Sequence, residues 1–129
     1  MAPGGTGVRP FLPLVIALAA GANFVARGFS GDPPGTAKLI VEAVRYPGFS
    51  FVEVLSPCVT YRPEQREWKN VVHAYEGDPT HDRGEAAERL TSDDGFTTGV
   101  LFTYDYPPYS LEVGNSRTAM ADIETEFAV

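Results

Sequence analysis

The chain has 129 residues, of which 43% are hydrophobic, so it is long enough for one domain with a single core and too short for two. Its formal charge of −7 and the absence of any basic run argue against binding to nucleic acid or to an anionic membrane surface. Because there is one cysteine, an internal disulfide is excluded. This removes the small disulfide-rich secreted scaffolds and favours a reducing compartment, the cytoplasm.

The first apolar segment has two interpretations. Residues 1–10 form a flexible glycine- and proline-rich lead-in, and residues 11–20 form an apolar run preceded by Arg9. This run, followed by the small residues 20–22, has the pattern of a secretory signal peptide. It is too short to cross a bilayer, which needs roughly 20 apolar residues. We favour a buried helix over residues 13–22 that is apolar all round and therefore covered on most sides.

A strand, a helix and a second strand follow within about 35 residues. The strand at 23–27 leads through a turn to a helix at 37–46, for which Asp32 or Thr36 is available as the N-cap. The second strand, at 49–55, is nearly apolar throughout, as expected where both faces of a sheet are covered. This order predicts a βαβ unit with parallel strands and a right-handed crossover.

Ser30 and Cys58 lie just beyond the ends of the two strands of this unit. Both are therefore expected at the same edge of the sheet. In open α/β sheets ligands bind at this carboxyl edge, so Cys58 is a candidate for chemistry. A lone cysteine is more often a small buried hydrophobe. From the residues alone the two interpretations of Cys58 are about equally supported.

The second half is less regular. It predicts a helix at 63–72, a short helix at 84–90 capped by Thr80 or Asp82, and a strand at 97–104. The fold class is therefore α/β with a βαβ unit, a mostly parallel sheet and an irregular C-terminal extension. We expect a lead-in at 1–10, one lobe at 11–110 and a tail at 111–129.

The two histidines do not form a recognisable catalytic or metal motif. His73 and His81 are eight residues apart and do not match a helical ligand pair, and the nearby Asp78 and Asp82 are ordinary turn residues. The sequence also lacks a G-x-S-x-G elbow, a P-loop and a G-x-G-x-x-G loop. A self-contained hydrolase, kinase or dinucleotide enzyme therefore has no support.

Two long segments carry a resemblance to a known family. They are LVIALAAGANFVARGFSGD at 14–32 and PGFSFVEVLSPCVTY at 47–61. In this order they resemble the C-terminal half of the beta subunit of 2-oxoacid:ferredoxin oxidoreductases. Shorter matches at Trp68, at the turn 78–80 and around 98–109 extend the similarity to residues 11–109.

The resemblance implies one lobe of a thiamine diphosphate-binding fold. It implies an enzyme in which the thiamine diphosphate ylide adds to a 2-oxoacid and carbon dioxide leaves. Electrons then pass one at a time through a [4Fe–4S] cluster to ferredoxin, and coenzyme A accepts the acyl group. In the branch with the S-P-C-V-T motif the cysteine is a cluster ligand, and this role as a metal and cofactor ligand falls on Cys58. Thiolate ligation is the usual mode for such clusters.

The sequence departs from the family in lacking the N-terminal half, which holds the other cluster ligands and the segment for magnesium and the diphosphate. The chain is therefore expected to contain no catalytic residue and to be inert without that half and the alpha subunit. One alternative is a non-catalytic α/β interaction module with Cys58 packed in the core, and another is a truncated gene product or a misread gene start. The identity of the 2-oxoacid, pyruvate, 2-oxoglutarate or a branched one, depends on residues outside this chain.

Overall fold

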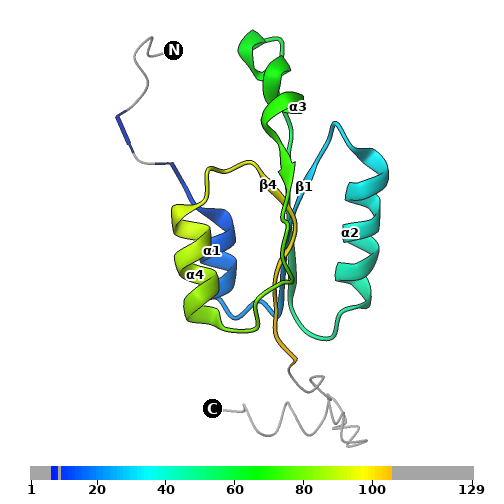
Figure 1. Cartoon of the computed structure of the whole chain (residues 1–129), viewed down its shortest axis with the longest axis vertical. Coiled ribbons are helices and arrows are strands. Elements are labelled where there is room, and N and C mark those ends of the chain that lie inside the picture. Colours follow the sequence, from blue (N-terminus) through cyan, green and yellow to red (C-terminus); the bar gives the residue numbers. More distant parts are fainter. Residues whose placement is uncertain (1–6, 9, 106–129) are drawn as a thin grey trace, which may run out of the picture.

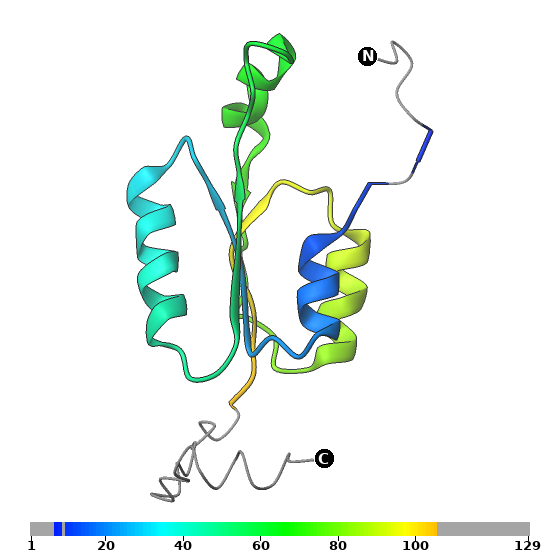
Figure 2. The same cartoon turned by 180° about the vertical axis from the view of Figure 1, so that it is seen from behind.

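A four-stranded sheet with helices on both faces forms the molecule. The computed structural model describes residues 7–8 and 10–105. Helix α2 covers one face of the sheet, and α1 and α4 lie side by side on the other (Figures 1 and 2). The elements are α1 (Pro13–Ala19), β1 (Phe24–Phe29), α2 (Pro33–Arg45), β2 (Ser50–Leu55), the 3-10 turn η1 (Pro63–Glu67), α3 (Trp68–Val71), β3 (His73–Ala74), α4 (Arg83–Ser92) and β4 (Thr97–Thr103).

The βαβ unit formed by β1, α2 and β2 confirms the sequence prediction. The two strands are parallel, and each residue of β1 from Phe24 to Phe29 lies opposite one of β2. Helix α2 begins at Pro33, four residues before the predicted start. Asp32 is its N-cap and accepts a hydrogen bond from the Gly35 amide at 3.2 Å. Proline fits this first turn because its missing amide would have no helical partner.

The sheet is mixed and mostly parallel, with the strand order β2-β1-β4-β3. Strand β4 runs antiparallel to β1, whereas the two-residue strand β3 is parallel to β4. The α/β prediction with a mostly parallel sheet is therefore confirmed. The sequence did not predict β3, which lies in the region where a continuous helix was expected to end. That helix is instead split into η1 and α3, which project beyond the sheet (Figure 1).

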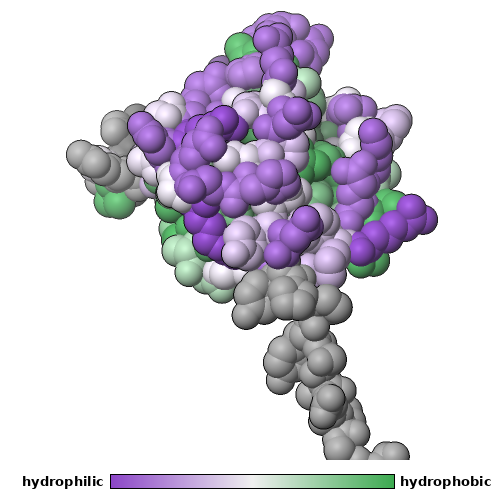
Figure 3. All heavy atoms as spheres, turned by 60° about the horizontal axis from the view of Figure 1, so that its bottom comes forward, coloured by the Kyte–Doolittle hydropathy of each residue, from purple (hydrophilic) through white to green (hydrophobic). Residues whose placement is uncertain are grey.

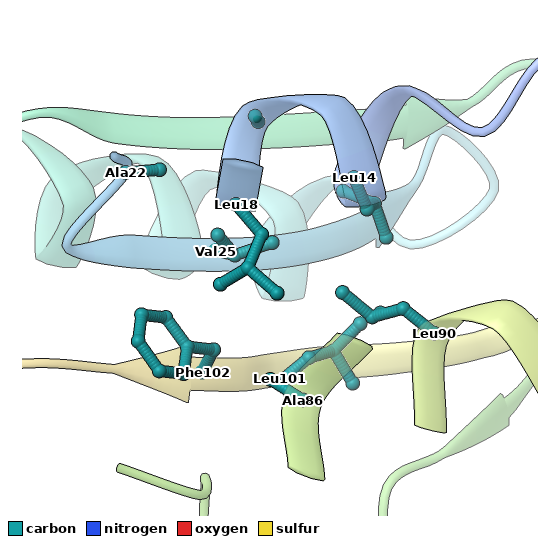
Figure 4. Packing of buried hydrophobic residues seen from close by; sticks show 9 residues of the cluster. Leu14, Leu18, Ala22, Val25, Ala86, Leu90, Leu101 and Phe102 are labelled. Atoms are coloured by element: carbon teal, nitrogen blue, oxygen red, sulfur yellow. The ribbon is translucent and has the colours of Figure 1, made fainter. Parts of the chain in front are cut away.

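The main core lies between the sheet and the pair α1 and α4. Figure 4 shows Leu14 and Leu18 of α1 facing Phe102 and Leu101 of β4, with Leu90 of α4 closing the layer. Phe102 has no exposed surface. Burial of these side chains is the main stabilising contribution that ties α1 and α4 to the sheet.

Helix α1 differs from the prediction in its length and in its environment. It ends at Ala19, before the predicted end at residue 22, and its outer side chain Ile16 is 50% exposed. The prediction that this helix is covered on most sides is wrong. Leu14, Ala17 and Leu18 supply the buried face, and the partly buried Val15 also packs against the core.

A smaller core lies under α2. Phe24 and Ala26 of β1 pack there with Ala43 of α2, and the rings of Phe24 and Tyr46 lie 5.3 Å apart. The Ser50 hydroxyl donates a hydrogen bond to the Ala43 carbonyl at 2.8 Å, which fastens the end of α2 to the start of β2. Both faces of β1 are therefore buried, and β1 is the central strand of the fold.

Strand β2 is packed on both faces, as predicted, but only partly, with Phe51 against the core under α1 and α4 and Val52 against the core under α2. It is an edge strand of the sheet that the described residues form, and its side chains are half-buried, with Val54 40% exposed. Strand β2 therefore carries more apolar side-chain surface than the elements packed against it bury.

The surface combines charged and apolar positions. On the face seen in Figure 3, hydrophilic side chains occupy most of the middle, and hydrophobic atoms show mainly toward the margins. Large exposed apolar side chains include Val44, at 81%, and Tyr61, at 71%. Single exposed apolar residues are normal on protein surfaces. By themselves they do not indicate a docking surface.

The predicted tail at 111–129 and most of the lead-in at 1–10 lie outside the described residues. Within the part of the chain that the structure describes, no helix has the length and apolar character needed to span a membrane.

The Phe102→Ala variant tests the main core. We expect it to lower the free energy of unfolding by about 3–5 kcal/mol, because it leaves a cavity between β4 and the helices. Phe11→Ala, which removes a side chain that is 73% exposed, is the control and should change the free energy by less than about 0.5 kcal/mol. Urea unfolding followed by circular dichroism measures both, and equal losses in the two variants would contradict this description of the core.

Candidate functional site

The carboxyl ends of β1 and β2 meet at one edge of the sheet, as predicted. Phe29 lies opposite Leu55, and the Ser30 amide donates a hydrogen bond to the Leu55 carbonyl at 2.9 Å. Beyond Leu55 the chain leaves the sheet and reaches Cys58 after two residues. The structure therefore brings Ser30 and the Cys58 loop to the same edge.

Cys58 is exposed and has a free thiol. Its backbone is held in place, because its amide donates to the Gln65 side-chain oxygen at 2.7 Å and its carbonyl accepts from the Arg62 amide at 2.8 Å. The apolar side chains of Val59 and Tyr61 that follow it are 39% and 71% exposed. The interpretation of Cys58 as a core residue is therefore wrong. A fixed backbone therefore carries an accessible sulfur.

Within residues 7–8 and 10–105, no group of three or more His, Cys, Asp or Glu side chains is placed to hold a metal ion. A [4Fe–4S] cluster is normally held by four thiolates. Cys58 is the one cysteine of the chain and can supply a single ligand. The chain can therefore supply at most one of the four thiolates, and its described residues form no metal site by themselves.

The histidines have structural contacts. The Nδ1 atom of His73 lies 3.0 Å from the Val71 carbonyl, and that of His81 lies 2.9 Å from the Thr103 carbonyl. Asp82 caps α4 by accepting from the Glu85 amide at 2.8 Å, as one of the two predicted caps. These contacts agree with the interpretation of this region as turns and caps.

A groove of about 630 Å³ lies at the same edge, between the start of α2 and the β3–β4 pair. Its lining includes both cationic and anionic side chains, with Lys38 and Lys69 near Asp32 and Glu42. Such mixed charge favours no particular ligand class. Cys58 is not among the lining residues, so its thiol is separate from this groove.

The sequence analysis missed a buried ionic network. Arg27 of β1 is 7% exposed, and its Nε atom donates to Glu53 of β2 at 2.6 Å. A second guanidinium nitrogen donates to the carboxylate of Asp93, in the turn before β4, and to the Thr97 carbonyl at 3.2 Å. An arginine in the middle of the otherwise apolar segment FVARGF was the available signal. Its partners are 26 and 66 residues away and could not be identified from spacing.

The network sets the protonation of Asp93. Burial raises the pKa of this carboxyl, but hydrogen bonds from Thr97 and Arg27, the charge of Arg27 and the Gly95 amide together outweigh burial. The pKa of Asp93 therefore lies below its ordinary value of 3.8. The ionised form is the one that the fold stabilises.

Known proteins are similar to this chain in sequence and in fold. The chain is 43% identical over 60 residues to the 2-oxoglutarate synthase subunit KorB of Archaeoglobus fulgidus, which covers 46% of this chain and 22% of that protein. It is 37% identical over 57 residues to a 2-oxoacid:ferredoxin oxidoreductase subunit beta from a Sulfolobus species, covering 43% of this chain and 19% of that protein.

A solved structure extends the similarity to most of the described fold. It is the 2-oxoglutarate:ferredoxin oxidoreductase from Magnetococcus marinus, with 2-oxoglutarate, coenzyme A and succinyl-CoA bound, and it is 31% identical with a TM-score of 0.71. The match covers 82% of this chain and 38% of that chain. The chain resembles the beta subunits of 2-oxoacid:ferredoxin oxidoreductases.

This result confirms the resemblance predicted from the sequence. No protein-family model matches the chain. The chain spans about a fifth of the length of the curated beta subunits that it matches. Most of the length of these oxidoreductase subunits therefore lies outside the matched region.

The Arg27→Gln variant tests the buried network. We expect it to lower the free energy of unfolding by about 3–5 kcal/mol, because removing one partner leaves the carboxylates of Glu53 and Asp93 partly buried without their cation. Lys38→Gln, at a side chain that is 78% exposed, is the control and should change it by less than about 0.5 kcal/mol. Urea unfolding at neutral pH measures both variants. An Arg27→Gln variant as stable as Lys38→Gln would contradict a stabilising network.

The Asp93→Asn variant tests how the free energy of unfolding depends on pH. A carboxyl whose pKa is lower in the folded state contributes stability above its unfolded pKa and loses it as the pH falls through its folded pKa. We expect the wild-type free energy of unfolding to fall as the pH is lowered from about 5 to about 2, and the fall to be smaller in Asp93→Asn. Asp94→Asn, at the neighbouring exposed residue, should retain the wild-type slope. Equal slopes for wild type and Asp93→Asn in urea titrations would refute this assignment.

Proposed function

We propose that this chain is part of the beta subunit of a 2-oxoacid:ferredoxin oxidoreductase and supplies Cys58 as one ligand of its [4Fe–4S] cluster. The observation that carries the proposal is the exposed, free thiol of Cys58 at the carboxyl end of β2, in a fold similar to that of a solved oxidoreductase. The reaction would be the oxidative decarboxylation of a 2-oxoacid to an acyl-CoA, with electrons passing to ferredoxin.

The surroundings of Cys58 suit a ligand that is shared with another polypeptide. Its backbone is fixed by Gln65 and Arg62, which keeps the sulfur at a defined place without burying it. The exposed side chains of Val59 and Tyr61 offer apolar surface to a neighbour. When bound, the cluster accepts and passes on single electrons.

The other cluster ligands and the cofactor-binding groups would come from other polypeptide chains. We expect three further cluster ligands, and the groups that hold thiamine diphosphate and magnesium, from the N-terminal half of the beta subunit, and the complex to be completed by an alpha subunit. The chain by itself would then be inert.

The names of the relatives support a proposal for the substrate class. The solved structure contains 2-oxoglutarate, coenzyme A and succinyl-CoA, and the Archaeoglobus subunit is named for 2-oxoglutarate, whereas other relatives are named for 2-oxoacids in general. We therefore propose a 2-oxoacid as substrate, coenzyme A as acyl acceptor and ferredoxin as electron acceptor. A cytoplasmic location would keep the exposed thiol of Cys58 reduced.

Anaerobic reconstitution tests the role of Cys58. The full chain would be co-expressed with the part of Archaeoglobus fulgidus KorB that precedes its similarity to this chain, and iron content and iron–sulfur absorbance would be measured on the purified complex. We expect a cluster with wild type, and its loss in Cys58→Ser and Cys58→Ala, because one of about four thiolate ligands is removed. Ser56→Ala, in the same loop, is the control and should retain the cluster.

Two results would contradict the proposal. An undiminished cluster in both Cys58 variants would mean that Cys58 is not a ligand and would favour a non-catalytic interaction module. Turnover by the wild-type chain alone, supplied with thiamine diphosphate, magnesium, coenzyme A and 2-oxoglutarate, would mean that the chain needs no other polypeptide.

A further inference from the structure

The loop that carries Cys58 is held by hydrogen bonds and not by burial. The side chains of residues 58–62 are all exposed, and none of these residues belongs to either hydrophobic core. A segment with few buried contacts keeps one conformation only if its polar backbone groups are engaged. The position of Cys58 therefore depends on the partners of its own amide and carbonyl.

Three hydrogen bonds close a ring between Cys58 and turn η1. The Arg62 amide donates to the Cys58 carbonyl at 2.8 Å, and the Gln65 amide donates to the Arg62 carbonyl at 2.9 Å. The Cys58 amide completes the ring by donating to the Gln65 side-chain oxygen Oε1 at 2.7 Å. The first two bonds join backbone groups, which nearly every residue type can supply. The third needs a side-chain acceptor, so it is the bond that depends on the identity of residue 65.

Gln65 stands on a segment that is anchored to the rest of the fold. Turn η1 continues directly into α3 at Trp68, whose ring packs edge-on against Phe96 with the ring centres 5.6 Å apart. Phe96 lies just before β4, and its carbonyl accepts from the His73 amide at 3.2 Å. Gln65 itself is half-buried, whereas the other four residues of η1 are exposed. The acceptor for Cys58 therefore has a defined place, as a group that orients a ligand needs.

The acceptor that holds the Cys58 amide carries no charge. A carboxylate is available one residue earlier, at Glu64, but this side chain is paired with the guanidinium of Arg62. Net charge and hydrogen bonds to the sulfur atoms are two of the features that set the reduction potential of an iron–sulfur cluster. An amide that is bound to Gln65 at 2.7 Å is not available to donate to a sulfur atom. Gln65 therefore engages a donor beside the thiol without adding a charge.

We propose that Gln65 is a positioning residue for the cluster ligand Cys58: it fixes the backbone of Cys58 and keeps its amide from donating to the sulfur atoms of the cluster. The inference rests on the proposed function for the presence of the cluster. It assigns to a second residue of this chain, which is not a ligand, a role in setting the reduction potential. Because hydrogen bonds to sulfur stabilise the reduced cluster, Gln65 holds the potential below the value that a free amide would give.

Two substitutions separate the acceptor of Gln65 from the shape of its side chain. Gln65→Leu keeps a similar size and removes the acceptor, whereas Gln65→Glu keeps an oxygen at the same reach. In the full chain we expect exchange of the Cys58 amide hydrogen, measured by NMR, to become about tenfold or more faster in Gln65→Leu and to stay within about threefold of wild type in Gln65→Glu. Asn70→Leu is the control, because the Asn70 amide donates to Glu67 at 2.6 Å. Wild-type exchange in Gln65→Leu, or equally fast exchange in Asn70→Leu, would overturn the proposal.

A redox titration of the anaerobic complex tests the role of Gln65 at the cluster. At a fixed applied potential we expect the ratio of reduced to oxidised cluster, measured by electron paramagnetic resonance, to rise about threefold or more in Gln65→Leu, because the freed amide donates to sulfur. In Gln65→Glu we expect it to fall about threefold or more, because a nearby carboxylate disfavours the added electron. Asn70→Leu and Asn70→Asp are the matched controls and should keep the wild-type ratio. The wild-type ratio in either Gln65 variant, or equal shifts in the controls, would overturn the proposal.

The iron content of the complex separates the failure of this inference from the failure of the proposed function. Loss of iron in Gln65→Leu, with iron retained in Gln65→Glu, would support the positioning role, and loss in both variants would overturn it, because Gln65→Glu keeps the acceptor. A cluster that depends on Cys58 but keeps its iron and its potential in Gln65→Leu would refute the positioning role alone. A wild-type complex without iron would refute the proposed function, whatever the exchange of the Cys58 amide shows.

Discussion

The buried guanidinium of Arg27 is the contact on which the carboxyl edge of the sheet depends. The parallel register places Arg27 opposite Glu53, so the ion pair joins neighbouring strands at the same level. Asp93 binds the same guanidinium from the turn before β4, on the other side of β1. A cation in this position is stable only because two carboxylates and a backbone carbonyl satisfy it. The network thus fixes β1, β2 and the start of β4 relative to one another.

The sequence was sufficient to predict the βαβ unit and insufficient to predict its environment. Apolar periodicity, Asp32 and the proline-glycine turn determine local structure, and local signals of this kind are readable from one sequence. The exposure of Ile16 was not readable, because it depends on whether another element covers the outer side of α1. The partners of Arg27 were not readable for a related reason, since Asp93 reaches it only when the sheet is formed.

Strand β2 and Cys58 show how far a local pattern reaches. The sequence of β2 predicted coverage on both faces, and Phe51 and Val52 do pack on opposite faces, although the strand lies at an edge of the described sheet and is only partly buried. The position of Cys58 at the carboxyl edge was predicted correctly, but its exposure was not, because a single cysteine carries no pattern. Sequence and structure usually agree at every level, so a local conflict marks a functional feature or an incomplete element.

The open edge and the exposed thiol belong to one continuous segment, and this links their physical roles. On one side β2 is held by β1 and by the pair Arg27 and Glu53, while its other side has no partner among the described residues. A ligand is positioned best when it stands on a rigid element. The pairing with β1 and the ion pair hold β2 only a few residues before Cys58, and the hydrogen bonds to Gln65 and from Arg62 hold the backbone of Cys58 itself. The position of the thiol is therefore set from both ends of its loop, by the sheet before it and by the turn after it.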